Sequence, residues 1–381
     1  MKYLLCFFSL VFCLSASLAS TNTIISPSAD RTDLVLGPAS CSTSGCHGGA
    51  GTTSRQFLIW SQRDVHSRAY ATLTSSRAAR MGEALKIENP TRDAACTACH
   101  APLQTVAPEF RAANAQIEEG VACASCHGTG ETWLRSHTRT DWTHADRVAA
   151  GMKDLRNLYG RANSCVACHQ NIDPQLVKVG KHPALVFELD GQTVSEPKHW
   201  RETAANDGAK AWFVGQAVAL REMSSALLHG RSDATLDAPR WAGLLWVLQQ
   251  CELGDAVPSL KTLAVVPGAD SYAATLEASD LAARRAASVT WTNDLTNTLL
   301  LKLAASHANF LESTASKIEQ ARRAERLVLA LDRLLAALPP ALRGEAANAQ
   351  LNTLFRLAQS PADFVPAEFA RELSAFEQAL K

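Results

Sequence analysis

Apolar side chains recur at helical spacing through most of residues 201–381. The clearest stripe lies in one segment, where apolar residues stand three or four positions apart. It consists of Ile318, Ala321, Ala324, Val328, Leu331, Leu335 and Leu338. Pro339 and Pro340 end the pattern, because proline cannot continue a helix. Similar patterns cover 209–229, 241–253, 272–287, 295–311, 346–359 and 366–380. This half is therefore predicted to be an all-α bundle of about five to seven helices.

Residues 41–200 carry a different pattern. Short stretches predict helices over 57–73, 77–86, 108–119 and 143–159, with glycine and proline in the loops between them. Only 185–189 alternates in the manner of a strand. Such a segment cannot build much of a core from its side chains alone. The predicted fold is mostly α, with a loose lead-in at 20–40, a first domain of short helices and loops at 41–200 and a helical domain at 201–381.

The first residues predict export from the cytoplasm. Lys2 precedes an apolar run over 3–14, and small residues follow up to Ala19, with Ser17-Leu18-Ala19 as a cleavage site. This is the pattern of a signal peptide at 1–19. The run is too short to span a bilayer by itself, although an uncleaved anchor is the alternative. We therefore expect a periplasmic or otherwise exported protein, without stable membrane insertion once the signal is removed.

Charge and cysteine content narrow the function further. The 381 residues include 37 Lys and Arg against 37 Asp and Glu, and this neutral balance argues against a nucleic-acid partner. Hydrophobic residues make up 47%, enough for a globular core. Of eleven cysteines, Cys6 and Cys13 belong to the signal and Cys251 stands alone. The other eight form four closely spaced pairs.

A histidine follows each of these cysteine pairs directly. The motifs are Cys41/Cys46 with His47, Cys96/Cys99 with His100, Cys123/Cys126 with His127, and Cys165/Cys168 with His169. Two thiols on one short turn can form thioethers with both vinyl groups of a haem, and the next imidazole then meets the iron, which is c-type haem attachment. Structural zinc needs no histidine after each pair, and exported disulfides are the other alternative. The first pair encloses four residues instead of two, which can loop out. The sequence predicts four covalent haem c groups.

Each iron needs a second axial ligand. The candidates are His66, His137, His144, His182 and His199, five for four positions. Methionine competes and raises the reduction potential, but this half offers only Met81 and Met152. Bis-histidine ligation and low potentials are therefore expected. His137 follows His127 so closely that we expect it to serve a neighbouring haem. The sequence does not supply the pairings, and His229 and His307 are assigned to surface or core.

The haem half, about residues 41–220, resembles the tetrahaem cytochromes of the c-552/c-554 type. The similar segments are 60–70, with a W-x-x-s-x-H-x-x-A-y pattern; 120–128, with G-V-x-C-x-x-C-H-G and a later His137; and 180–189 with 198–200. The resemblance implies a helical fold around close-packed haem pairs. Relatives often carry a further haem motif where this chain has only Cys251, so a lost fifth site is one hypothesis. A buried apolar thiol is the alternative.

Three functions follow as expectations. The first is electron transfer to redox partner proteins through haems with two histidine ligands each. The second is a haem enzyme acting on nitrite, hydroxylamine or nitric oxide at one open haem, as the resemblance to the c-554 type, which has one five-coordinate haem, allows. The third is an electron-transfer subunit of a larger respiratory complex. The helical half is expected to cover the haem domain, or alternatively to dock a partner.

Overall fold

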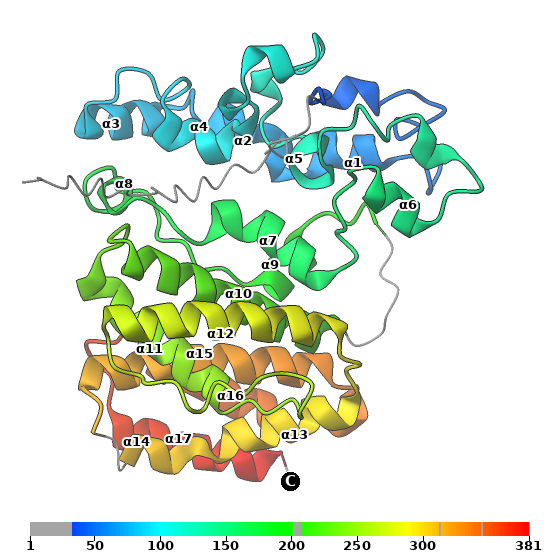
Figure 1. The fold of residues 1–381 in the computed structure, drawn as a ribbon. Helices are drawn as coiled ribbons and strands as arrows, with labels where there is room; N and C mark the ends of the chain where they lie inside the picture. Colours follow the sequence, from blue (N-terminus) through cyan, green and yellow to red (C-terminus); the bar gives the residue numbers. More distant parts are fainter. Residues whose placement is uncertain (1–32, 201–206, 312–313, 344–345, 381) are drawn as a thin grey trace, which may run out of the picture.

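The computed structural model describes residues 33–200, 207–311, 314–343 and 346–380. The predicted signal peptide and most of the lead-in lie outside the described residues. Within them the chain is mostly helical and contains no β-strand, which confirms the predicted fold class. Figure 1 shows the chain running from the N-terminal helices at the top, through a middle layer, to a compact helical bundle below.

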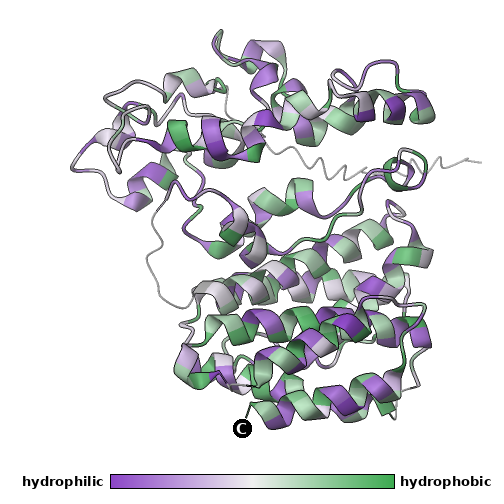
Figure 2. Cartoon of the chain, turned by 180° about the vertical axis from the view of Figure 1, so that it is seen from behind, coloured by the Kyte–Doolittle hydropathy of each residue, from purple (hydrophilic) through white to green (hydrophobic). Residues whose placement is uncertain are grey.

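The C-terminal half forms a helical bundle as predicted, but its described residues form eight α-helices and not five to seven, because a 3-10 turn at Ala305–His307 divides the helix predicted at 295–311. Its helices are α10 (Asp207–Leu228), α11 (Ala234–Gln249), α12 (Ala269–Ser288), α13 (Asn293–Ala304), α14 (Ala308–Leu311), α15 (Lys317–Ala337), α16 (Ala347–Ala358) and α17 (Pro366–Ala379). Helix α10 lies between the middle layer and the rest, packing on α7 and α9 as well as on α11, α12 and α15. Apolar and polar residues interleave along these helices in Figure 2, as a one-sided core requires.

The N-terminal half is built from shorter pieces. Its α-helices are α1 (Gln56–Arg63), α2 (Ala69–Thr72), α3 (Ser76–Leu85), α4 (Ala94–His100), α5 (Cys123–His127), α6 (His144–Ala149), α7 (Leu158–His169), α8 (Pro174–Lys178) and α9 (Leu189–Ser195). Single 3-10 turns connect them at Pro38–Ser40, Val65–Arg68, Pro102–Thr105, Pro108–Phe110, Ile117–Glu119 and Ser136–Thr138. In the C-terminal half such turns occur at Ala305–His307 and Pro340–Leu342.

Two predicted helices are broken where the chain is capped or turned. The helix expected at 57–73 stops at Asp64, whose side chain instead caps the next turn by accepting from the backbone of His66. The helix expected at 143–159 ends after Ala149, because Gly151 adopts φ 110°, which a right-handed helix cannot contain. In both places a polar cap or a glycine overrides apolar periodicity.

Two other predictions were wrong. Residues 108–119 form no α-helix, because Val35 pairs with this segment: its N–H donates to Phe110 O (2.8 Å) and its carbonyl accepts from Ala112 N (3.0 Å). Residues 185–189 form no strand. The backbone of Phe187 is satisfied by side chains instead, accepting from Gln216 and donating to Gln170.

Buried apolar residues concentrate in the bundle and in the layer above it. The main core joins the bundle helices to Leu158, Ala162 and Val166 of α7 and to Phe187 and Leu189. The upper layer contributes only a small second cluster around Val35 and Leu103. The apolar core therefore includes residues before position 200, in the segment that carries the fourth cysteine motif. Packing against the bundle holds this motif in place.

Polar contacts fasten the middle layer to the bundle as well. From α7, the Tyr159 hydroxyl donates to Asp280 on α12 (2.7 Å), and Arg221 on α10 donates to both Asp280 (2.8 Å) and Asn163 (2.7 Å). Arg326 of α15 is 8% exposed and reaches Glu188, beside α9, at 3.5 Å. Because α7 ends at His169 and α9 precedes His199, the bundle positions both segments.

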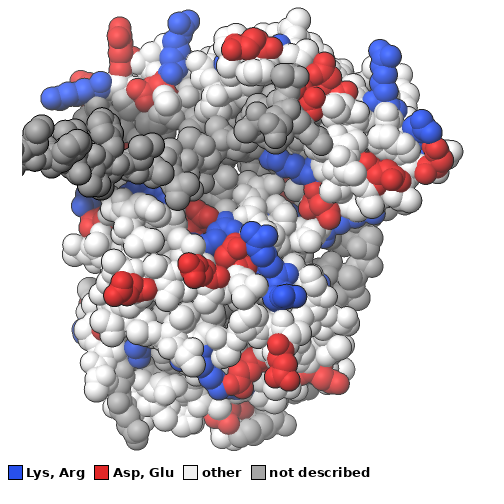
Figure 3. All heavy atoms as spheres, viewed as in Figure 1, with Lys and Arg blue, Asp and Glu red and all other residues white. Residues whose placement is uncertain are grey.

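Basic and acidic side chains are interspersed over the face in Figure 3, in keeping with a neutral chain. Among the described helices, none has the combination of length and apolar character that crossing a membrane requires.

Candidate haem sites

Three of the four cysteine motifs lie at the end of a helix. Helices α4, α5 and α7 each end on the histidine of their motif, so the two thiols and the imidazole share one turn. The first motif forms a turn instead, in which His47 N donates to Cys41 O (3.1 Å) and Cys46 N donates to Thr43 O (2.9 Å). These bonds fold the two extra residues into a loop and return His47 to the vicinity of Cys41.

Each motif histidine faces one histidine from elsewhere in the chain. The ring centroids are 6.1 Å apart for His47 and His137, 6.4 Å for His100 and His182, 6.4 Å for His127 and His199, and 6.0 Å for His169 and His66. Every pair thus combines one motif histidine with one candidate second ligand. The structure supplies the pairing that the sequence left open.

This separation suits a metal between the two rings. A metal–nitrogen bond to histidine is about 2.0 Å long, and about 1.2 Å from each nitrogen to its ring centroid gives centroids about 6.4 Å apart. The four observed values of 6.0–6.4 Å lie at or slightly below that distance. Rings stacked directly on one another would be closer, so these pairs fit an iron with two axial imidazoles.

In most of these histidines Nδ1 forms a hydrogen bond, which leaves Nε2 available to bind a metal. In six of these histidines Nδ1 faces an oxygen. The partners are Gln56 Oε1 for His47 (2.9 Å), Asp64 Oδ1 for His66 (3.0 Å), Ala69 O for His100 (3.2 Å), Leu134 O for His137, Pro183 O for His182 (2.8 Å) and Pro197 O for His199 (3.4 Å). Carbonyl and carboxylate oxygens only accept, so Nδ1 carries the hydrogen and the lone pair of Nε2 is free for a metal.

Side chains of different motifs touch one another. The thiols of Cys41 and Cys123 are hydrogen-bonding neighbours, which brings the first and third motifs together. The thiols of Cys99 and Cys168 do the same for the second and fourth, whose helices α4 and α7 are in contact. These contacts arrange the four motifs as two pairs, first with third and second with fourth.

The two pairs meet at the third and fourth sites. Burial, then the nearby Cys126, raises the pKa of the Cys165 thiol to about 12. Burial followed by the imidazoles of His199 and His47 lowers the pKa of His127 to about 4, so this ring is neutral and able to ligate a metal at pH 7. The contacts together order the sites as first, third, fourth and second.

The segment similar to the W-x-x-s-x-H pattern is tied to the third motif by its backbone. The Trp60 indole donates to Val121 O (3.0 Å), and Val121 N donates to His66 O (3.0 Å). Gly120 adopts φ 66°, and a Cβ there would lie 2.7 Å from His66 O. The glycine, the valine and the tryptophan therefore fix where His66 stands relative to Cys123, which explains this combination of residues.

Two carboxylates beside His66 were not among the residues predicted from the sequence. Ligand atoms of Asp64, His66 and Glu196 lie within 4.8 Å of one another, and in the described part of the chain no other group of three or more such side chains is as close. Burial acts to raise the pKa of Asp64, but hydrogen bonds from His66 outweigh it and the pKa is lowered. No cysteine belongs to the group, so the zinc alternative gains no support. In the sequence, Asp64 could have been found as a residue type that caps helical turns, placed two residues before His66. No sequence pattern pointed to Glu196.

Two predicted candidates lie apart from the ring pairs. His144 begins α6, and its Nε2 is 2.9 Å from Asp154 Oδ1, so the structure does not bring it opposite a motif histidine. Cys251 is 5% exposed within the bundle core, where its thiol donates to Val247 O, and burial raises its pKa to about 12. This environment fits the alternative of a buried apolar thiol.

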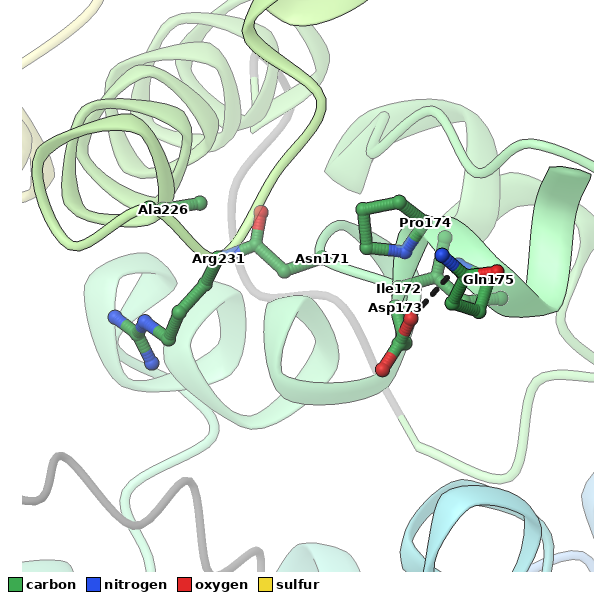
Figure 4. A pocket seen from close by; sticks show the side chains of 8 residues that line it. Asn171, Ile172, Asp173, Pro174, Gln175, Ala226 and Arg231 are labelled. Atoms are coloured by element: carbon green, nitrogen blue, oxygen red, sulfur yellow. Dashed lines mark hydrogen bonds between the residues drawn. The ribbon is translucent and has the colours of Figure 1, made fainter.

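A surface hollow lies beyond the fourth motif, between the start of α8 and the end of α10 (Figure 4). Asn171, Asp173 and Arg231 are among its lining residues, and Asp173 accepts from Gln175 N (2.7 Å). Its lining includes no cysteine or histidine. The chemistry-bearing side chains are thus in the ring pairs, not in this hollow.

Cysteine pairs that each directly precede a histidine are the attachment motif of c-type haem, and the comparison below supports haem-based electron transfer. Residues 40–128 match the model of the family described as cytochrome c554 and c-prime. The matched part contains the first three motifs and His66, and it supports covalent haem c in this chain. No curated protein and no solved structure matches the chain.

Proposed function

We propose that this protein is an exported electron carrier with four haem c groups, each held by one cysteine pair and two histidines. The observation that carries the proposal is the set of four ring pairs, each joining one motif histidine to one histidine from elsewhere at 6.0–6.4 Å. Bound haem supplies an iron that changes between ferric and ferrous states. The protein supplies thioether bonds, axial imidazoles and their orientation.

Each side chain has a defined task under this proposal. The thiols of each motif would hold the haem through its vinyl groups, and the motif histidine and its partner histidine would provide the nitrogen ligands of the iron. Nδ1 hydrogen bonds hold the rings at a fixed angle, for example His47 on Gln56 and His182 on Pro183. Because each motif histidine faces a second histidine, the arrangement favours a carrier over an enzyme, which needs an open iron position.

The order of the sites supports transfer along the protein. The contacts between motifs support an order in which the sites of His47 and His100 lie at the two ends and those of His127 and His169 lie between them. The turn of the first motif is exposed at Cys46, which offers a place for a redox partner protein to approach. The bundle then serves as the support that holds α7 and α9.

A spectroscopic redox titration of protein matured in the periplasm tests this function. We expect four haems per chain by haemochrome assay, low-spin spectra in both oxidation states and reversible reduction. Nitric oxide, nitrite and hydroxylamine should leave the spectra of the oxidised protein unchanged. A high-spin fraction that shifts on adding these molecules would show an open haem and overturn the carrier proposal in favour of an enzyme.

A further inference from the structure

His66 differs from the other histidines of the ring pairs in the charge of its outer partner. Of the six rings whose Nδ1 faces an oxygen, His66 alone is held by a carboxylate, Asp64 Oδ1 at 3.0 Å. The others meet uncharged amide, hydroxyl or backbone carbonyl oxygens, as His47 does at Gln56 and His100 at Thr72. Among these six rings, His66 alone therefore has a negatively charged group on its Nδ1 side.

Asp64 is held in place from two directions. Its residue is 2% exposed, and its Oδ1 accepts from the backbone N–H of His66 (2.9 Å) as well as from the ring. Its own backbone N–H donates to Ile59 O and Trp60 O at the end of α1, and its carbonyl accepts from Ser67 Oγ (2.8 Å). The carboxylate therefore cannot swing away from the imidazole without unmaking the turn at Val65–Arg68.

A second carboxylate reinforces the charge. Glu196, the C-cap residue directly after α9, brings an oxygen within 4.8 Å of both the Asp64 and the His66 ligand atoms. Arg161 is the cation whose charge also reaches Glu196. Two acids against one cation leave the surroundings of His66 negative, and both acids also lie within reach of His199 at the third site.

We propose that Asp64, reinforced by Glu196, makes the site of His66 and His169 the one with the lowest reduction potential of the four. This inference rests on the proposed function. A ferric iron carries one more positive charge than a ferrous iron, so a buried carboxylate on its axial imidazole stabilises the oxidised state. A hydrogen bond to an anion also makes the imidazole a more basic ligand, and this too lowers the reduction potential. Asp64 is thus a positioning residue that acts through His66.

Asp64→Asn in the fully matured protein tests this inference. Asparagine keeps the cap and an acceptor for His66 but removes the charge. We expect the lowest of the four midpoint potentials to rise by about 59 mV, which for one electron is a tenfold increase in the reduction equilibrium constant. The other three should move less. Glu196→Gln, which alters no cap, should raise the same potential by a smaller amount.

Two matched variants identify the site and test the charge argument. His66→Gly should convert to high spin the haem whose potential Asp64→Asn moves, which assigns that potential. Gln56→Glu places a carboxylate on Nδ1 of His47, and it should lower a different potential. If four haems are present and neither Asp64→Asn nor Glu196→Gln moves the lowest potential, the inference is overturned while the carrier function stands. A protein without haem would overturn the carrier function itself.

Discussion

Removal of His137 tests whether this histidine serves the first haem site, as the ring pairs indicate, and not the site of His127. His137 follows His127 by ten residues, and, in line with the expectation that it serves a neighbouring haem, its ring faces His47 at 6.1 Å while His127 faces His199 at 6.4 Å. His137→Gly should therefore open the haem bound by Cys41 and Cys46. With one of four ring pairs broken, a quarter of the ferric haem should become high spin.

The assay is the high-spin fraction by optical and electron paramagnetic resonance spectroscopy, with added imidazole to restore the low-spin state. His199→Gly should open a second haem, so that the double variant has half of its haem in the high-spin state. If His137 and His199 served the same haem, the double variant would open only one. His144→Gly is the matched control, because the ring of His144 is held by Asp154, and it should remain fully low spin.

Three further predictions concern the scaffold. Arg326→Ala removes the nearer of the two cations of Glu188 and leaves Arg333 at 3.9 Å, so it should lower the free energy of unfolding by about 3 kcal/mol, the lower end for a broken buried pair, measured by urea titration; a loss below about 1 kcal/mol would mean that the pair contributes little. Gly120→Ala should cost about 3 kcal/mol, from positive φ and the close approach to His66 O, whereas Gly230→Ala, with similar φ and open space around it, should cost about 1 kcal/mol; equal losses would contradict the close approach. Burial acts to raise the pKa of Asp280, but hydrogen bonds from α7 and α10 outweigh it, so the pKa is lowered. The ionised Asp280 therefore stabilises the fold above about pH 4, and this stabilisation is lost as the pH falls through the lowered pKa. Asp280→Asn should flatten that acid limb in pH-dependent unfolding, and an unchanged limb would assign it to other groups.

Helices and loops were predictable to different degrees. Apolar periodicity is a local signal, so it identified the bundle from α10 to α17 well. It failed at 57–73 and 143–159, where a capping aspartate and a glycine of positive φ interrupt otherwise helical patterns. It failed again at 108–119, because Val35, far away in the chain, pairs with the backbone on either side of Arg111 and interrupts the predicted helix. Long-range pairing leaves no trace in local periodicity.

The site residues also differ in whether the sequence alone could identify them. The cysteine motifs and their histidines are contiguous words in the sequence, so the sequence alone identified them as candidates. The partner of each motif histidine depends on how loops from different segments meet, as His66 meets His169. The five candidates for four positions could be separated only when the structure placed His144 on Asp154. Glu196 joins His66 from a distant helix end, so no sequence pattern pointed to it.

Intact and peptide mass spectrometry of protein matured in the periplasm tests the central claim most directly. The account predicts a mass gain of four haem groups, located on four peptides that contain Cys41, Cys99, Cys123 and Cys168 with their paired cysteines. Unmodified thiols at these motifs, or disulfides in place of the added cofactor, would contradict it.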